Sequence, residues 1–106
     1  MSQASPGRID AGLLATGASV LEHELLAEKA AALGRLGARV EASLGRLRDH
    51  DRTEMDAAVH RDLLAEAADA VWCFFVQREL CGLKDQSDVI AQYAIPREVL
   101  VRLGAR

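Results

Sequence analysis

The stretch 70–76 constrains the fold of this chain more than any other part of the sequence. It is apolar throughout and holds three of the four aromatic residues, Trp72, Phe74 and Phe75. Aromatic and β-branched residues favour strands, but the flanking segments 64–68 and 77–80 consist of strong helix formers. The helical period of apolar residues also runs through the stretch. We therefore predict that it lies on a helix that is buried on nearly all sides.

The composition favours a single all-α domain. The chain has 106 residues and two prolines, and it is 50% hydrophobic but only 4% aromatic, so alanine and leucine carry most of the apolar fraction. A net charge of −3 provides no clustered basic surface for phosphates. No apolar run reaches the length of about 18 residues that a membrane span needs, and the N-terminus lacks a secretory signal. We expect a cytoplasmic protein.

Capping patterns divide the chain into a tail and a helical domain. Residues 1–18 are rich in Gly, Ser and Ala, and we expect them to form a flexible tail. A single helical domain is predicted over 19–106. Ser19 and Glu22 form a capping box, which predicts a first helix over 20–49.

A second long helix is predicted after a polar break at 50–52. Thr53 and Asp56 have the spacing of an N-terminal cap, so the helix should run over 54–81. Gly82 then has the position of a residue that ends a helix in the left-handed conformation. Two helices of this length with a short connection predict a long antiparallel helical hairpin.

Two short helices should follow the hairpin. Asp85 lies in a third capping segment, which predicts a helix over 86–93. Pro96 suits the first position of a fourth helix over 96–103, and Gly104 ends it.

A lone hairpin would leave much of its apolar surface in water, which predicts a partner. The large apolar residues of the first helix form one stripe: Leu26, Leu33, Leu36, Val40, Leu44 and Leu47. A two-fold dimer of hairpins, closing into a four-helix bundle, would cover this stripe and the 70–76 stretch. The alternative is a compact monomer whose first helix breaks near Gly34 or Gly37. The residues expected in the core or the interface are Leu26, Leu33, Val40, Trp72, Phe74 and Phe75.

Glycines within the first helix also suggest close packing. Glycine in a helix costs about 0.5–1 kcal/mol relative to alanine, so Gly34, Gly37 and Gly45 require a reason. One reason is the close approach of another helix backbone on a second side of this helix. The alternative is an exposed face without a packing role.

No constellation of residues predicts a catalytic, cofactor-binding or metal site. Di-metal bundles use Glu-x-x-His pairs, but Val20, Leu47 and Ala57 stand three residues before the histidines. Asp56 and His60 could share a helix face, and a surface hydrogen bond or ion pair is the expected outcome. Cys73 and Cys81 should lie about 12 Å apart along one helix, too far for a disulfide. We expect a protein that is not an enzyme and binds no cofactor.

Nucleic-acid binding is the alternative function. The third and fourth helices superficially resemble a helix-turn-helix, and arginines gather along the first helix. However, the second of these short helices has only Arg97 and Arg102 as basic residues, whereas base readout needs several donors there. Acidic residues interleave with the other arginines, which is typical of a salt-bridged surface.

Several segments resemble a small family of uncharacterised alphaproteobacterial helical proteins. They are VLEHELLAEKA at 20–30 with Leu33 and Gly34, AADAVWCFFVQRE at 67–79, CGL at 81–83 and YAIPREVL at 93–100. The resemblance covers roughly residues 19–105. It implies a stand-alone bacterial helical domain and no particular activity. The sequence therefore predicts a non-enzymatic helical interaction module that forms a homodimer.

Overall fold

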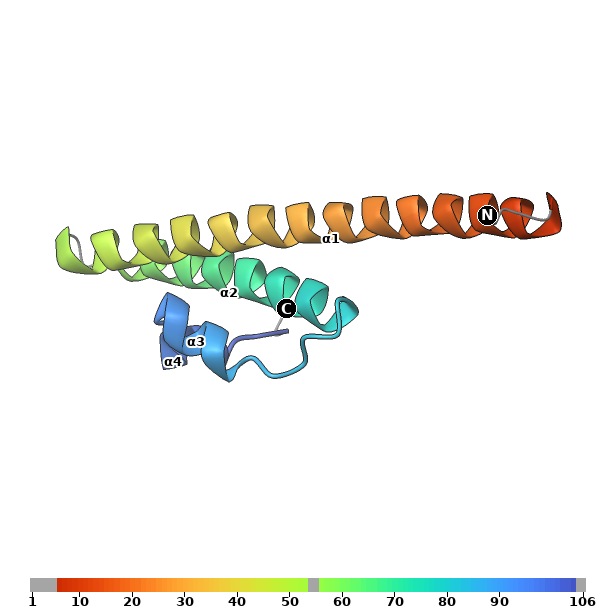
Figure 1. Cartoon of the computed structure of the whole chain (residues 1–106). Coiled ribbons are helices and arrows are strands. Elements are labelled where there is room, and N and C mark those ends of the chain that lie inside the picture. Colours follow the sequence, from red (N-terminus) through yellow and green to blue (C-terminus); the bar gives the residue numbers. More distant parts are fainter. Residues whose placement is uncertain (1–5, 54–55, 105–106) are drawn as a thin grey trace. The chain divides into compact units, whose positions relative to one another are not determined.

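A computed structural model describes residues 6–53 and 56–104, with side chains over 19–51 and 56–104. The described residues form four helices and no strand, which confirms the all-α class (Figure 1). The helices are α1 (Pro6–Thr53), α2 (Ala57–Leu80), α3 (Ser87–Tyr93) and α4 (Arg97–Leu100). The chain divides into two compact units, residues 1–31 and 32–106. The predicted division into a tail over 1–18 and a single domain over 19–106 stays a prediction.

Helix α1 extends beyond both predicted ends. It begins at Pro6 and not at Val20, so Ser19 lies inside the helix and is not a cap. Proline suits a first helical position, and the helix runs on through Gly12 and Gly17, since extending an existing helix adds one hydrogen bond per residue without a new nucleation step. The predicted tail over 1–18 is therefore helical from residue 6, and residues 1–5 lie outside the described part. The polar residues 50–52 do not break the helix, which ends at Thr53.

Asp56, and not Thr53, caps helix α2. The Asp56 carboxylate accepts hydrogen bonds from the backbone N–H groups of Ala58 (2.9 Å) and Val59 (3.1 Å). These are the donors that an N-terminal cap satisfies. Asp56 stands directly before the first helical residue, Ala57, which explains why it takes this role.

The predicted end of α2 at Gly82 is confirmed. Gly82 has a φ of 86°, in the left-handed region that glycine tolerates. The N–H of Leu83 donates to the carbonyl of Arg78 (2.8 Å), and that of Gly82 to the carbonyl of Glu79 (2.9 Å). This pair of bonds is the Schellman motif. Arg78 further fixes the loop, because its Nε donates to Oε1 of Gln86 at 2.6 Å.

Helix α3 agrees with its predicted place, and α4 is shorter than predicted. The Asp85 carboxylate accepts from the N–H of Ser87 at the start of α3 (2.9 Å). Ala94 ends that helix with a φ of 52°. Helix α4 has four residues, is preceded by Pro96 at its cap and gives way to a turn over 101–104.

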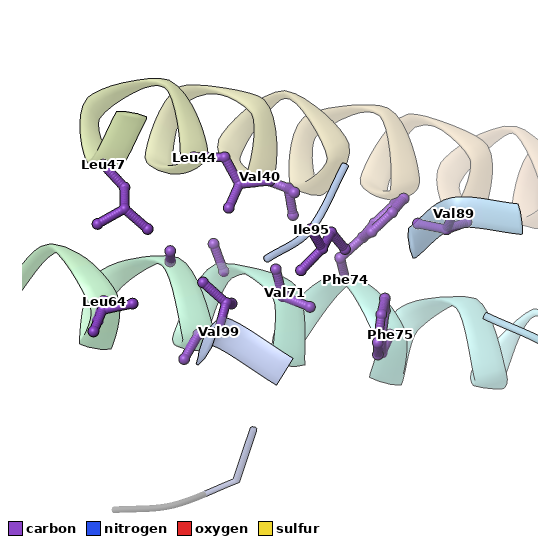
Figure 2. Packing of buried hydrophobic residues seen from close by; sticks show 13 residues of the cluster. Val40, Leu44, Leu47, Leu64, Val71, Phe74, Phe75, Val89, Ile95 and Val99 are labelled. Atoms are coloured by element: carbon purple, nitrogen blue, oxygen red, sulfur yellow. The ribbon is translucent and has the colours of Figure 1, made fainter. Parts of the chain in front are cut away.

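The second unit contains a core built from all four helices. Its large buried side chains are Val40, Leu44, Leu47, Leu64, Val71, Phe74, Phe75, Val89, Ile95 and Val99. Figure 2 shows Leu44 and Leu47 pointing from α1 toward α2. The Phe74 ring meets Tyr93 of α3 edge to face, with centroids 5.6 Å apart, a favourable arrangement for two aromatic rings.

Within this unit, α1 and α2 pack as the predicted antiparallel hairpin. Arg39 pairs with Asp69 at 2.7 Å, and Arg46, further along α1, pairs with Glu66, which is earlier on α2. This order of pairing is that of two antiparallel helices. None of the described helices has both the length and the apolarity needed to cross a membrane.

One glycine of α1 has a packing role, but against a side chain of α3 and not against the helix backbone that the sequence predicted. A Cβ atom added to Gly37 would lie 2.7 Å from the Tyr93 hydroxyl oxygen, closer than nonbonded atoms allow, whereas Gly34 and Gly45 have open space. Gly37 is buried, and it lets the α3 tyrosine approach the α1 backbone. The helix does not break at Gly34 or Gly37.

Candidate functional site

The six residues predicted for a core or an interface separate into buried and exposed groups. Val40, Phe74 and Phe75 lie in the core, and Leu33 packs against it. Leu26 and Trp72 are exposed, by 62% and 42%. The stretch 70–76 is therefore not buried on all sides within one chain, and an interface role for its exposed residues stays a prediction.

A segment of α1 in the first unit exposes four large aliphatic side chains. Every residue from Ser19 to Ala31 is exposed. The four residues, here called the α1 apolar segment, are Val20, Leu21, Leu25 and Leu26, and each is at least half exposed. Single apolar residues are common on protein surfaces, but four exposed within seven positions of one helix indicate a candidate interface.

The second unit exposes an apolar face on α2. Trp72, Val76 and Leu80 are spaced four residues apart and so lie along one side of the helix. We call them the α2 apolar face. The Trp72 ring also lies beside the turn at Gly104, where an added Cβ would be 3.6 Å from the ring. Exposed tryptophan is notable because it is enriched among the residues that dominate binding energy.

A polar cluster joins three helices of the second unit. Nδ1 of His60, in the first turn of α2, lies 2.7 Å from Oδ1 of Asp51 near the end of α1. Its Nε2 lies 3.5 Å from Oε2 of Glu98 on α4. One polar side-chain atom from each of the three residues lies within 4.8 Å of the other two. We call these three residues the junction cluster.

The cluster differs from the pair that the sequence suggested. The predicted partner of His60 was Asp56, whose carboxylate instead caps α2. The pKa of His60 is raised, mainly by the hydrogen bond with Asp51 and further by Glu98, while partial burial opposes both. His50 lies beside it, with the two ring centroids 6.4 Å apart, and is mostly buried.

The comparisons with known proteins place the chain in a family. Residues 5–106 match the model of a family described as "Family of unknown function (DUF6665)". The chain belongs to this family. No curated protein and no solved structure matches the chain. The sequence resembled a family of uncharacterised proteins, and this assignment to a family of unknown function agrees with that resemblance. The bacterial group stays a prediction.

The DUF6665 fold gives little support to the nucleic-acid alternative. Helix α4 has four residues and one arginine, Arg97, and Arg102 lies in the turn beyond it. Two arginines of α1, Arg39 and Arg46, pair with acidic residues of α2. These features agree with the salt-bridged surface that the sequence predicted.

Sequence reasoning missed the junction cluster of this DUF6665 chain. Its members are separated by nine and 38 residues, so no local spacing connects them. The available signal was the predicted hairpin itself, because residues just before and just after a helix connection become neighbours. The role of Glu98 required knowing that α4 returns to the start of α2.

Proposed function

We propose that this DUF6665 protein is a non-enzymatic helical interaction module that acts as a homodimer. In the proposed dimer, two hairpins associate as a four-helix bundle, and the second copy covers the α1 apolar segment. The observation that carries the proposal is the exposure of Val20, Leu21, Leu25 and Leu26 on consecutive turns of one helix.

Helix energetics support a partner for this segment. Isolated helices are marginal in water, and most of their stability in proteins comes from packing an apolar side. All described side chains over 19–31 are exposed, so packing within the described chain does not supply that stability. The neighbouring helices of a bundle would bury aliphatic side chains of this segment, each worth about 1.5–3 kcal/mol when fully removed from water.

A second copy of the chain is the simplest such partner. The α2 apolar face is a second exposed apolar surface on the same chain. In a two-fold dimer, a contact between the α1 apolar segment of one chain and the α2 apolar face of the other occurs twice by symmetry. Both apolar surfaces of each chain can therefore be covered together.

We further expect the protein to reside in the cytoplasm, which fractionation of the host cell would test.

Sedimentation velocity of the full chain tests the proposal. We expect wild-type protein at high micromolar concentration to sediment as particles of twice the 11.5 kDa chain mass. Leu25→Glu and Trp72→Glu should each shift the protein toward monomer, because both place a charge in the proposed interface. Gln92→Glu, at an exposed position of α3, is the matched control and should remain dimeric. Wild-type particles of 11.5 kDa alone would overturn the proposal.

A further inference from the structure

We propose that His60 is a proton-dependent link between three helices, and that loss of one proton from its ring releases helix α4 from the junction of α1 and α2. The ring lies between two carboxylates. Its Nδ1 is 2.7 Å from Oδ1 of Asp51 on α1, and its Nε2 is 3.5 Å from Oε2 of Glu98 on α4. The proposal does not depend on dimerisation, because all three residues belong to the second unit of one chain.

The two contacts of the ring require two N–H groups. An ionised carboxylate only accepts hydrogen bonds, so each ring nitrogen must donate to the carboxylate that it faces. Neutral imidazole has one N–H group, and imidazolium has two. Only the charged form of His60 can therefore hold Asp51 and Glu98 at the same time.

The two contacts are unequal in length, which decides the one that is lost first. The 2.7 Å contact with Asp51 has the length of a strong charge-assisted hydrogen bond, whereas 3.5 Å is longer than most hydrogen bonds. A neutral His60 ring should therefore keep its proton on Nδ1. Its Nε2 would then direct a lone pair at the Glu98 carboxylate, so the contact with α4 becomes repulsive while the contact with α1 persists.

The described charged and titratable groups around His60 come from the same three helices. Helix α1 contributes Asp51 and the His50 ring, whose centroid is 6.4 Å away and whose Nε2 lies 3.3 Å from the carbonyl oxygen of Asp56. Helix α4 contributes Glu98. On α2 itself, Asp56 lies one turn before His60, and its carboxylate caps the helix. The hydrogen bond with Asp51 is the main cause of the raised pKa of His60, and Glu98 raises it further.

The apolar packing of α4 limits what the lost contact can do. Val99, next to Glu98, is fully buried, and Leu100 and Leu103 pack against the core. These contacts do not titrate, so α4 should loosen without leaving the core. A group whose pKa is raised by folding contributes stability below its unfolded pKa and loses it as the pH rises through the folded pKa. Helix α4 should thus be held most firmly below the ordinary His60 pKa of 6.5 and loosen above it.

The test is a titration of the full-length protein between about pH 5 and pH 9, with the histidine rings followed by NMR. We expect His60 to titrate above 6.5. The backbone N–H groups of Leu100 and Val101 donate to carbonyls of the α4 turn. Their protection from solvent exchange, corrected for the intrinsic effect of pH, should fall as His60 loses its proton.

Two variants separate the link from a general effect of charge. Glu98→Gln should lower the titration midpoint of His60 toward 6.5 and should remove the fall in α4 protection that follows this titration. Glu41→Gln is the matched control, since it neutralises an exposed glutamate of α1 outside the cluster, and it should behave as wild type does. A wild-type midpoint at or below 6.5, or an equal midpoint in folded Glu98→Gln, would overturn the proposal.

A third variant keeps the test decisive if Glu98→Gln fails to fold. His60→Gln cannot take up a proton at this position, so its α4 protection should not change over the pH range in which His60 titrates in wild type. The same fall in protection in wild type and His60→Gln would overturn the proposal, as would wild-type protection that stays constant throughout the titration.

Discussion

Gly37 shows how one missing side chain positions a helix. The Tyr93 hydroxyl occupies the space where a Cβ atom would stand, and the Phe74 ring is the next neighbour. Gly37→Ala should therefore force Tyr93 to move and should destabilise the protein by about 1–3 kcal/mol, as overpacking of a core does. Chemical denaturation monitored by circular dichroism measures the change.

Gly34→Ala is the matched control for this substitution. Gly34 is on the same helix and has open space around it, so alanine should stabilise the protein there by about 0.5–1 kcal/mol. Equal effects at both positions would contradict the packing role of Gly37.

Single residues were predicted well where a local rule governs them. Gly82 follows from the rules for helix ends, and the free state of Cys73 and Cys81 follows from helix geometry. The exposure of Trp72 within one chain could not be predicted in this way. Its apolar neighbours predict a buried helix, but they do not indicate which side the other helices cover.

At the scale of the helix, the carboxylate of Asp56 makes the start of α2 sensitive to pH. Hydrogen bonds from Val59, and then Ala58, hold the pKa of Asp56 below its ordinary value of 3.8. A group with a lowered pKa in the folded state contributes stability above its unfolded pKa and loses it as the pH falls through the folded pKa. Asp56 should therefore stabilise α2 at neutral pH and less so in acid.

Asp56→Asn keeps a capping side chain but removes this titration. Between about pH 5 and pH 2, wild-type protein should lose more stability than the asparagine variant, as measured by urea denaturation at each pH. Asp56→Ala removes the cap itself, so it should be less stable than Asp56→Asn at neutral pH. If wild type and Asp56→Asn lose the same stability as the pH falls, the charge of the Asp56 carboxylate does not contribute to the stability of the protein.

The number and type of helices could be predicted from the sequence, but several boundaries could not. Periodicity and the absence of proline from residues 7–95 indicate helices over long ranges. A capping pattern such as Ser19 with Glu22 is a weaker signal, because the same residues occur inside helices. The junction cluster depends on contacts between helices, so its geometry could only be found in the folded structure.

At the scale of the whole molecule, buried apolar residues stabilise the fold of one chain, whereas exposed apolar residues are available for the association of two chains. Leu44 is 1% exposed and Leu25 is 60% exposed, although both are leucines on α1. Burial within the chain stabilises the fold at any concentration. Burial between copies stabilises it only when the copies associate, so it depends on concentration.

The thermal stability of the proposed dimer should therefore rise with protein concentration. Leu44→Ala should lower stability by about 2–5 kcal/mol and reduce the melting temperature at every concentration, because it leaves a cavity in the core. Leu25→Ala should instead reduce the dependence on concentration and leave the melting temperature of dilute protein near that of wild type. Calorimetric scans across a hundredfold range of concentration measure both effects. A wild-type melting temperature that is the same throughout this range would contradict the dimer, and the exposed leucines of α1 would then have to meet a different partner.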